Sequence, residues 1–114
     1  MTRDLNRGEH KKKLILGSRI FYIRELRFDN GCFLAICEGE SERIGGLSVA
    51  LKIAQRVNSS NVIPMKYGSV FGSLMAETVA AITGGIAIFS LFLLSELDGE
   101  TFQFLQKEVK KFMK

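Results

Sequence analysis

The sequence is poor in the residues that most often carry catalysis, metal binding or covalent cross-links. Its 114 residues include no Trp, one Pro, one His and two Cys. A single Pro excludes collagen-like chains and proline-rich linkers, and two Cys are too few for a disulfide-stabilised scaffold. The histidine, His10, lies in a strongly charged segment and is a poor candidate for a general base. No Cys/His spacing typical of a metal site is present, and we do not expect an enzyme.

What the sequence does have is the composition of one folded domain. Hydrophobic residues make up 46% of the chain and charged residues 25%, which is ordinary for a globular protein and too apolar for a disordered one. The length fits one domain of common size. We expect a mobile basic arm over residues 1–10 and a single domain over residues 11–114.

The net charge of +4 is concentrated at the two ends of the chain. A basic fringe can bind nucleic acid or an anionic membrane surface. It is also typical of a frayed N-terminus and of the last turns of a helix, where Lys complements the helix dipole. No aromatic residues alternate with the basic ones in a stripe, which favours the second interpretation. The basic residues are Arg3, Arg7, Lys11, Lys12 and Lys13 at the start, and Lys107, Lys110, Lys111 and Lys114 at the end.

Residues 78–95 form an uncharged run whose length is close to that of a membrane-spanning helix. Gly84 and Gly85 interrupt this run, and glycine commonly ends a helix. Before the pair, apolar residues recur every three or four positions, as in a helix; after it, β-branched and aromatic residues follow one another, as in a buried strand. The pattern predicts a helix that ends at the glycine pair and then a central strand, rather than a membrane span.

The two cysteines indicate the compartment. Cys32 and Cys37 lie five positions apart in one predicted strand, and this odd offset points their side chains to opposite faces, so they cannot pair. They are typical of small buried residues in a reducing environment. No apolar signal segment follows the polar start, and we expect a cytoplasmic protein.

The order of the predicted elements indicates an α+β fold. Strands are expected first and helices last, with an N-terminal antiparallel β-meander followed by β-α-β-α, giving one mixed sheet with two helices packed on it. Asn30-Gly31 predicts a hairpin turn, and Ser95 or Asp98 can begin the final helix. The expected strands are residues 12–17, 19–29, 32–38, 47–53 (with a helix as the alternative), 62–65 and 86–94; residues 56–61 are expected to form a loop and residues 70–83 a helix.

Two glycine-containing segments could bind an anion. In the first, Gly45 and Gly46 follow Arg43, and their backbone amides could hold a phosphate. A turn or a β-bulge is the alternative there. In the second, Lys66, Gly68 and Ser69 precede a predicted helix, whose free N–H groups favour an anion. A plain Ser cap is the alternative.

Carboxylates are the remaining candidates. Glu38, Glu40 and Glu42 alternate and could face one side, although a solvated acidic loop is favoured over a metal site. Glu77 is the sole charge between Tyr67 and Ser95.

Three stretches carry a resemblance to a known family. They are residues 43–51 (RIGGLSVAL), residues 62–68 (VIPMKYG) and the region from Ala76-Glu77-Thr78 to residues 85–88 (GIAI). Their layout resembles the D-type accessory subunits of the hydroxyarylic-acid (gallate-type) decarboxylases, a family also described as prenylated-flavin chaperones. The chain departs from this family at Arg43, where the family commonly has His, and in the loop after Lys66, which lacks the family's His and acid.

The resemblance implies a non-enzymatic accessory protein. It would bind FMN or prenylated FMN, or the catalytic partner in a flavin-dependent decarboxylase, with the phosphate near Arg43, Gly45, Gly46, Lys66, Gly68 and Ser69. A different interpretation comes from residues 86–94, which carry more apolar surface than a small sheet easily covers; it predicts a homo-oligomer with a structural or interaction role and no cofactor. A third is weak nucleic-acid binding through the basic ends.

Overall fold

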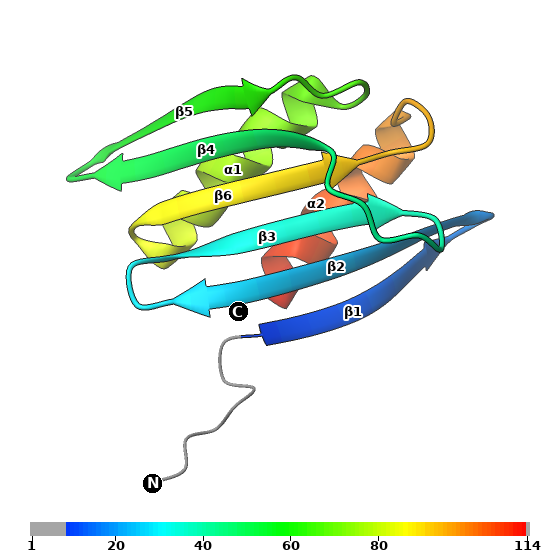
Figure 1. Cartoon of the computed structure of the whole chain (residues 1–114), viewed down its shortest axis with the longest axis horizontal. Helices are drawn as coiled ribbons and strands as arrows, with labels where there is room; N and C mark the ends of the chain where they lie inside the picture. Colours follow the sequence, from blue (N-terminus) through cyan, green and yellow to red (C-terminus); the bar gives the residue numbers. More distant parts are fainter. Residues whose placement is uncertain (1–8, 114) are drawn as a thin grey trace, which may run out of the picture.

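The computed structural model describes residues 9–113, which form one mixed sheet with two helices (Figure 1). The sheet has six strands in the order β1-β2-β3-β6-β4-β5. The predicted α+β class, with a meander followed by strands and helices, is confirmed. The elements are β1 (Glu9–Leu16), β2 (Arg19–Phe28), β3 (Gly31–Glu38), β4 (Gly46–Ile53), β5 (Arg56–Ile63), α1 (Ser69–Thr83), β6 (Ile86–Phe92) and α2 (Gly99–Phe112).

The first three strands form the predicted meander. Gly17 makes the turn between β1 and β2 in the left-handed conformation, which glycine adopts at no steric cost. The predicted hairpin between β2 and β3 is present, but its two loop residues are Asp29 and Asn30, and Gly31 is the first residue of β3. Strand β6 then inserts between β3 and β4, parallel to β3 and antiparallel to β4. The β6 strand is therefore the central strand that its apolar sequence predicts.

Helix α1 ends where the glycine pair predicts. Gly84 takes the left-handed conformation at the helix C-terminus, and its N–H donates to the carbonyl of Ala80 at 2.8 Å. Strand β6 begins two residues later. The run of residues 78–95 is therefore a helix end and a strand, and no helix within residues 9–113 is both long and apolar enough to cross a membrane.

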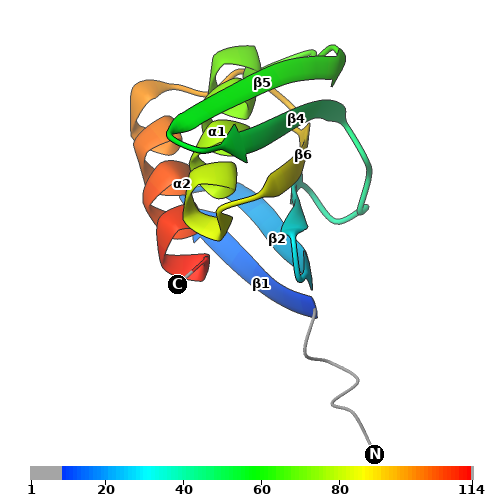
Figure 2. The same ribbon diagram turned by 90° about the vertical axis from the view of Figure 1, so that its left-hand side faces the viewer.

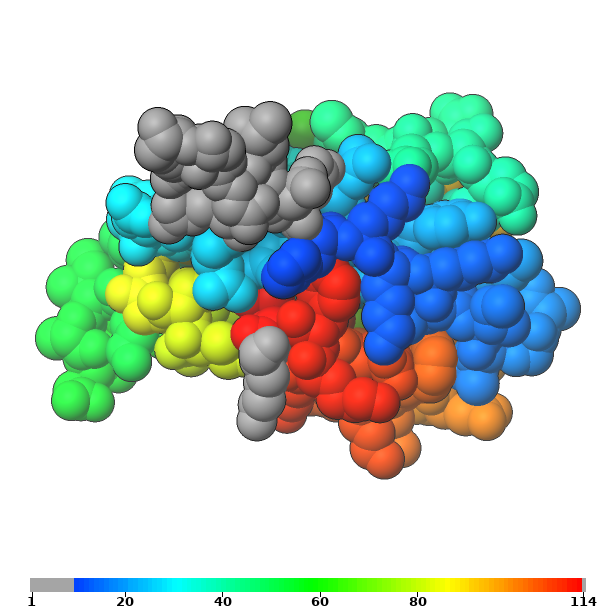
Figure 3. Space-filling view, turned by 90° about the horizontal axis from the view of Figure 1, so that it is seen from below, coloured from blue at the N-terminus to red at the C-terminus, as the bar shows by residue number. Residues whose placement is uncertain are grey.

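Both helices lie on the same face of the sheet (Figure 2). The Phe71 ring of α1 packs edge-on against Phe89 of β6 and against Phe102 of α2, with ring centroids 6.2 and 5.1 Å apart. At the other side of the molecule α2 lies beside β1 (Figure 3), where Phe112 packs on His10. Because α1 and α2 share one face, the opposite face of the sheet is covered by neither helix.

Two segments differ from the prediction. Residues 56–61 were expected to form a loop and instead form most of β5, an edge strand paired along its length with β4. The prediction is wrong because Asn58, Ser59, Ser60 and Asn61 are polar, whereas an edge strand tolerates polar side chains that a central strand would not. The predicted arm over residues 1–10 overlaps β1, since Glu9 and His10 pair with β2; residues 1–8 lie outside the described part of the chain.

Candidate functional site

The sheet face opposite the helices, which we call the open face, is apolar over its central strands. Side chains of β3, β6 and β4 alternate, so that one set packs under the helices and the other points to the open face. The open-face set of these strands includes no charged residue. Phe28 at the end of β2 is 57% exposed and Ile53 at the end of β4 is 59% exposed. The large apolar residues of the open face include Leu26, Phe28, Phe33, Leu47, Val49, Leu51, Ile53, Ile86, Ile88 and Phe92.

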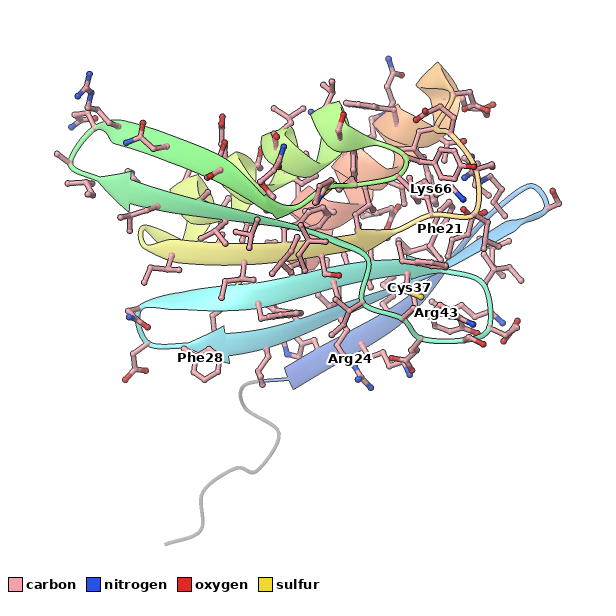
Figure 4. All side chains as sticks on the ribbon, turned by 45° about the horizontal axis from the view of Figure 1, so that its top comes forward. Phe21, Arg24, Phe28, Cys37, Arg43 and Lys66 are labelled. Atoms are coloured by element: carbon pink, nitrogen blue, oxygen red, sulfur yellow. The ribbon has the colours of Figure 1, made fainter. Side chains whose placement is uncertain are left out.

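Two shallow grooves run over the open face on either side of Phe33. The first, of about 390 Å³, lies between Leu26, Phe28 and Ile86. The second, of about 280 Å³, lies between Tyr22 and the loop of residues 39–45. Figure 4 shows Phe28 at one end of the sheet, with Cys37 and Arg43 toward the other. Exposed apolar side chains therefore lie at both ends of this face: Phe28 at one end, and Ile15 and Ile44 at the other.

The loop of residues 39–45 covers the other end of the open face through ion pairs. Glu42 lies 2.6 Å from the Lys11 Nζ and 3.4 Å from an Arg24 guanidinium nitrogen. The Lys11 hydrogen bond and the two positive charges lower the pKa of Glu42. Under the loop, the Cys37 Sγ accepts the Arg43 backbone N–H at 3.1 Å. The rim of the open face thus carries both signs of charge, whereas its centre carries neither.

The first predicted anion segment is held by packing. The Gly45 N–H donates to the Ser90 hydroxyl at 3.1 Å, so this amide already has a partner. A Cβ at Gly45 would overlap the Leu91 carbonyl, and one at Gly46 would overlap Met65. The Arg43 guanidinium lies 5.7 Å from the centroid of the Phe92 ring. The glycines are thus required by the close approach of the loop to β6 and to the segment after β5.

The second predicted segment begins α1, as expected, but with a different cap. Gly68 occupies the cap position in the left-handed conformation, and no side chain caps the helix, so Ser69 is not the cap. The Gly68 N–H donates to the Glu96 carboxylate at 3.1 Å. An anion that binds this amide has to displace Glu96.

The structure brings the six predicted site residues to the same end of the sheet, but not to one groove. Gly45, Gly46 and Lys66 line a groove of about 330 Å³, and Lys66 also borders a groove of about 400 Å³ with Gly68 and Ser69. Arg43 lines the groove beside Tyr22 on the open face instead, apart from Lys66 (Figure 4). Whether these residues bind a cofactor stays a prediction.

The three alternating carboxylates serve different partners. Glu38 is buried and paired with Arg19, Glu42 is paired with Lys11, and Glu40 accepts a hydrogen bond from the Tyr22 hydroxyl at 3.3 Å. Within residues 9–113, no cluster of three or more His, Cys, Asp or Glu side chains could hold a metal ion. The lone charge of α1, Glu77, accepts a hydrogen bond from the Ser59 hydroxyl of β5.

The comparisons with known proteins show the fold and no more. No family model and no curated protein matches the sequence, and nothing in the comparisons supports the resemblance to the decarboxylase accessory family. The structure is similar to a chain in the crystal structure of a chaperone complex for yeast 20S proteasome assembly. The two chains are 14% identical with a TM-score of 0.65, and the match covers 93% of this chain and 98% of the other.

The sequence analysis identified surplus apolar surface in residues 86–94 but not its continuation over β2, β3 and β4. The signal for it was present in β2, where apolar residues occupy both parities. Phe21 and Ile23 are fully buried under the helices, while Tyr22, Leu26 and Phe28 alternate with them and point the other way. A strand that is apolar on both sides is normally covered on both sides.

Proposed function

We propose that this protein is a non-enzymatic, chaperone-like accessory protein that acts by binding protein surfaces, and that its open face binds a second copy of the chain. The observation that carries the proposal is the uncovered apolar face of the sheet. The fold that the chain shares with a proteasome-assembly chaperone component supports an accessory role.

The open face is too apolar to be the outer surface of an isolated domain. Single exposed apolar residues are common on proteins, but contiguous patches above a few hundred Å² mark interaction sites. Here Leu26, Phe28 and Ile86 surround one groove, and Leu51 and Ile53 continue the surface across β4. Burial of this surface is favourable by about 25 cal/mol for each Å² removed from water.

A second copy of the chain presents a matching apolar face. Two sheets pack face to face when both present flat apolar surfaces about 10 Å apart. The centre of the open face carries no charge that a second copy would repel. The rim carries Glu42 next to Lys11 and Arg24, and a surface with both signs at its edge can be self-complementary about a two-fold axis.

A narrower form of the proposal adds a cofactor. It assigns FMN or prenylated FMN to the grooves beside Lys66, and the catalytic component of a flavin-dependent decarboxylase as the partner. It rests on the family resemblance and on the common groove of Gly45, Gly46 and Lys66. Its failure would leave the protein-binding role in place.

The test is the mass of the protein in solution. Light scattering across a dilution series is expected to give a dimer. Phe28→Asp and Ile53→Asp place a charge in the interface and are expected to give monomers, while the helix-face variant Ile82→Gln stays a dimer. All three side chains are exposed in one chain, so circular dichroism should show each variant folded. A monomer mass for the unaltered protein at every concentration would overturn the dimer.

A further inference from the structure

Helix α1 is apolar around most of its circumference, although neither the sheet nor α2 covers its outer side. Its 15 residues include one charged side chain, Glu77. A helix that is apolar all round is normally buried all round. Yet Val70 is 73% exposed and Ile82 is 43% exposed. This contrast indicates that the outer side of α1 is covered by something else.

The polar groups of α1 are turned away from this outer side or are already bonded. Glu77 accepts from the Ser59 hydroxyl of β5 at 2.5 Å. The Thr78 hydroxyl donates to the Leu74 carbonyl of its own helix at 2.8 Å, so the residue offers its methyl group to the surface. The remaining residues on this side of α1 follow one another at intervals of about one helical turn. We call them the outer stripe: Val70, Leu74, Thr78, Ala81 and Ile82.

A groove of about 420 Å³ separates the outer stripe from α2. Its walls are Thr78, Ala81 and Ile82 on α1 and Lys110 on α2. Lys107 lies three residues before Lys110 and is thus its neighbour on the helix surface. Within residues 9–113, neither lysine forms an ion pair, whereas Lys111 is paired with Glu108 at 3.5 Å. The groove has an apolar wall on one side and a positive wall on the other.

We propose that this groove binds an amphipathic helix of a protein partner, with apolar side chains against the outer stripe and acidic side chains against Lys107 and Lys110. A ridge of helix side chains fits the hollow between two packed helices. The two lysines select acidic rather than basic neighbours. The inference goes beyond the proposed function: the second copy uses the open face, and the helix layer on the opposite side binds the client.

An anionic membrane surface is the other occupant with this chemistry. Interfacial helices bind lipid with an apolar side flanked by basic residues. Lys107 and Lys110 are, however, fewer than the four to eight clustered basic residues typical of segments that bind anionic lipid. The protein partner is therefore favoured.

The experiment uses the full chain and two synthetic helical peptides. Both peptides carry Leu at positions i, i+3, i+4 and i+7, with Glu at the remaining positions in one and Lys in the other. In an NMR titration of the labelled protein, the Glu peptide is expected to shift amides of the outer stripe and of residues 106–110, and the Lys peptide to leave them unchanged. Lys110→Glu is expected to lower the affinity for the Glu peptide about fivefold, as for the loss of one exposed ion pair. The same substitution should allow the Lys peptide to bind.

The controls separate this inference from the dimer. Ile82→Gln should abolish peptide binding and leave the mass in solution unchanged, whereas Ile53→Asp should change the mass and leave peptide binding unchanged. Equal binding of both peptides, or shifts confined to the open face, would contradict the inference. So would binding to phosphatidylglycerol vesicles, but not to either peptide, that is lost in Ile82→Gln.

Discussion

Arg19 and Glu38 form a bidentate pair that fastens three segments at one end of the sheet. The Arg19 Nε and Nη2 lie 2.9 and 2.8 Å from the two carboxylate oxygens of Glu38. The same guanidinium donates to the carbonyls of Ser95 and Glu96, at 3.1 and 3.0 Å, and Glu38 accepts the Leu94 N–H at 2.9 Å. The pair therefore links the start of β2 and the end of β3 to the segment between β6 and α2.

Removing one partner of this pair should destabilise the fold. Glu38 is 6% exposed, and the loss of its charge leaves the partly buried Arg19 without its carboxylate partner, at a cost of about 1–3 kcal/mol. Urea unfolding of Glu38→Gln is the measurement, with the midpoint expected to fall and the slope to stay the same. The matched control is Glu42→Gln, which alters an exposed carboxylate and should hardly move the midpoint. Equal effects of the two substitutions would show that the pair does not fasten these segments.

The same pair predicts the response to acid. Burial alone would raise the pKa of Glu38, but hydrogen bonds from Arg19 and the Leu94 amide, with the Arg19 charge, lower it below its ordinary value. A carboxyl whose folded-state pKa is lowered contributes stability above its unfolded pKa of about 4.3 and loses it as the pH falls through the folded pKa. Unfolding midpoints measured between neutral pH and the acid range should fall steeply below that value. In Glu38→Gln this decline should be shallower; an identical decline would assign it to other carboxyls.

Much of the fold could be predicted because its signals are local. Gly17 in the first hairpin and Gly84 at the end of α1 both take the left-handed conformation, which sets the direction of the chain within a few residues. Asp98 is one of the two predicted helix starts, and its carboxylate accepts the Thr101 N–H at 2.7 Å. These features depend on neighbours in the sequence.

The features that could not be predicted depend on tertiary contacts. The sequence of β5 predicts a loop because it is polar. In the structure its polar side chains bond to polar side chains of α1, as Ser59 does to Glu77. The sequence around Gly45 and Gly46 predicts an anion-binding loop. In the structure these positions are glycine because a Cβ would overlap Leu91 or Met65. No local pattern distinguishes a glycine that admits a ligand from one that admits another part of the chain.

Gly46 and Gly72 test this packing, because Met65 lies against both. A Cβ at Gly46 would come within 2.6 Å of the Met65 Cα, which is backbone and cannot move away. A Cβ at Gly72 would meet the Met65 thioether, the flexible end of the side chain. Gly46→Ala should therefore cost about 2–3 kcal/mol by overpacking. Gly72→Ala should cost much less, since Ala also favours a helix by about 1 kcal/mol. Thermal unfolding of both variants is the measurement, and the reverse order would contradict the argument.

Flavin binding is tested by two substitutions that are expected to change the affinity for FMN in opposite directions. If FMN phosphate binds at the start of α1, Lys66→Ala should weaken it because a positive charge is lost. Glu96→Gln should strengthen it, since the carboxylate that now accepts the Gly68 N–H loses its charge. The measurement is the quenching of FMN fluorescence on titration. No binding by the unaltered protein at high ligand concentration, or no response to either substitution, would remove the cofactor from the proposal.

The two cysteines should differ in their reaction with an alkylating reagent. Cys32 is covered by the helix layer, and burial, with the negative charge of Glu25, raises the pKa of its thiol to about 11. At pH 8 only about one molecule in a thousand then carries the reactive thiolate.

Cys37 is also buried, but its cover on the open face is the loop of residues 39–45, whose Arg43 amide donates to its sulfur. Loops open more readily than the packed core, so iodoacetamide should modify Cys37 well before Cys32. Mass spectrometry of peptides from the Ile53→Asp variant, in which no second copy is expected to cover the loop, measures the order, and denatured protein, in which both react alike, is the control. Earlier modification of Cys32 would mean that the helix layer opens more readily than the loop.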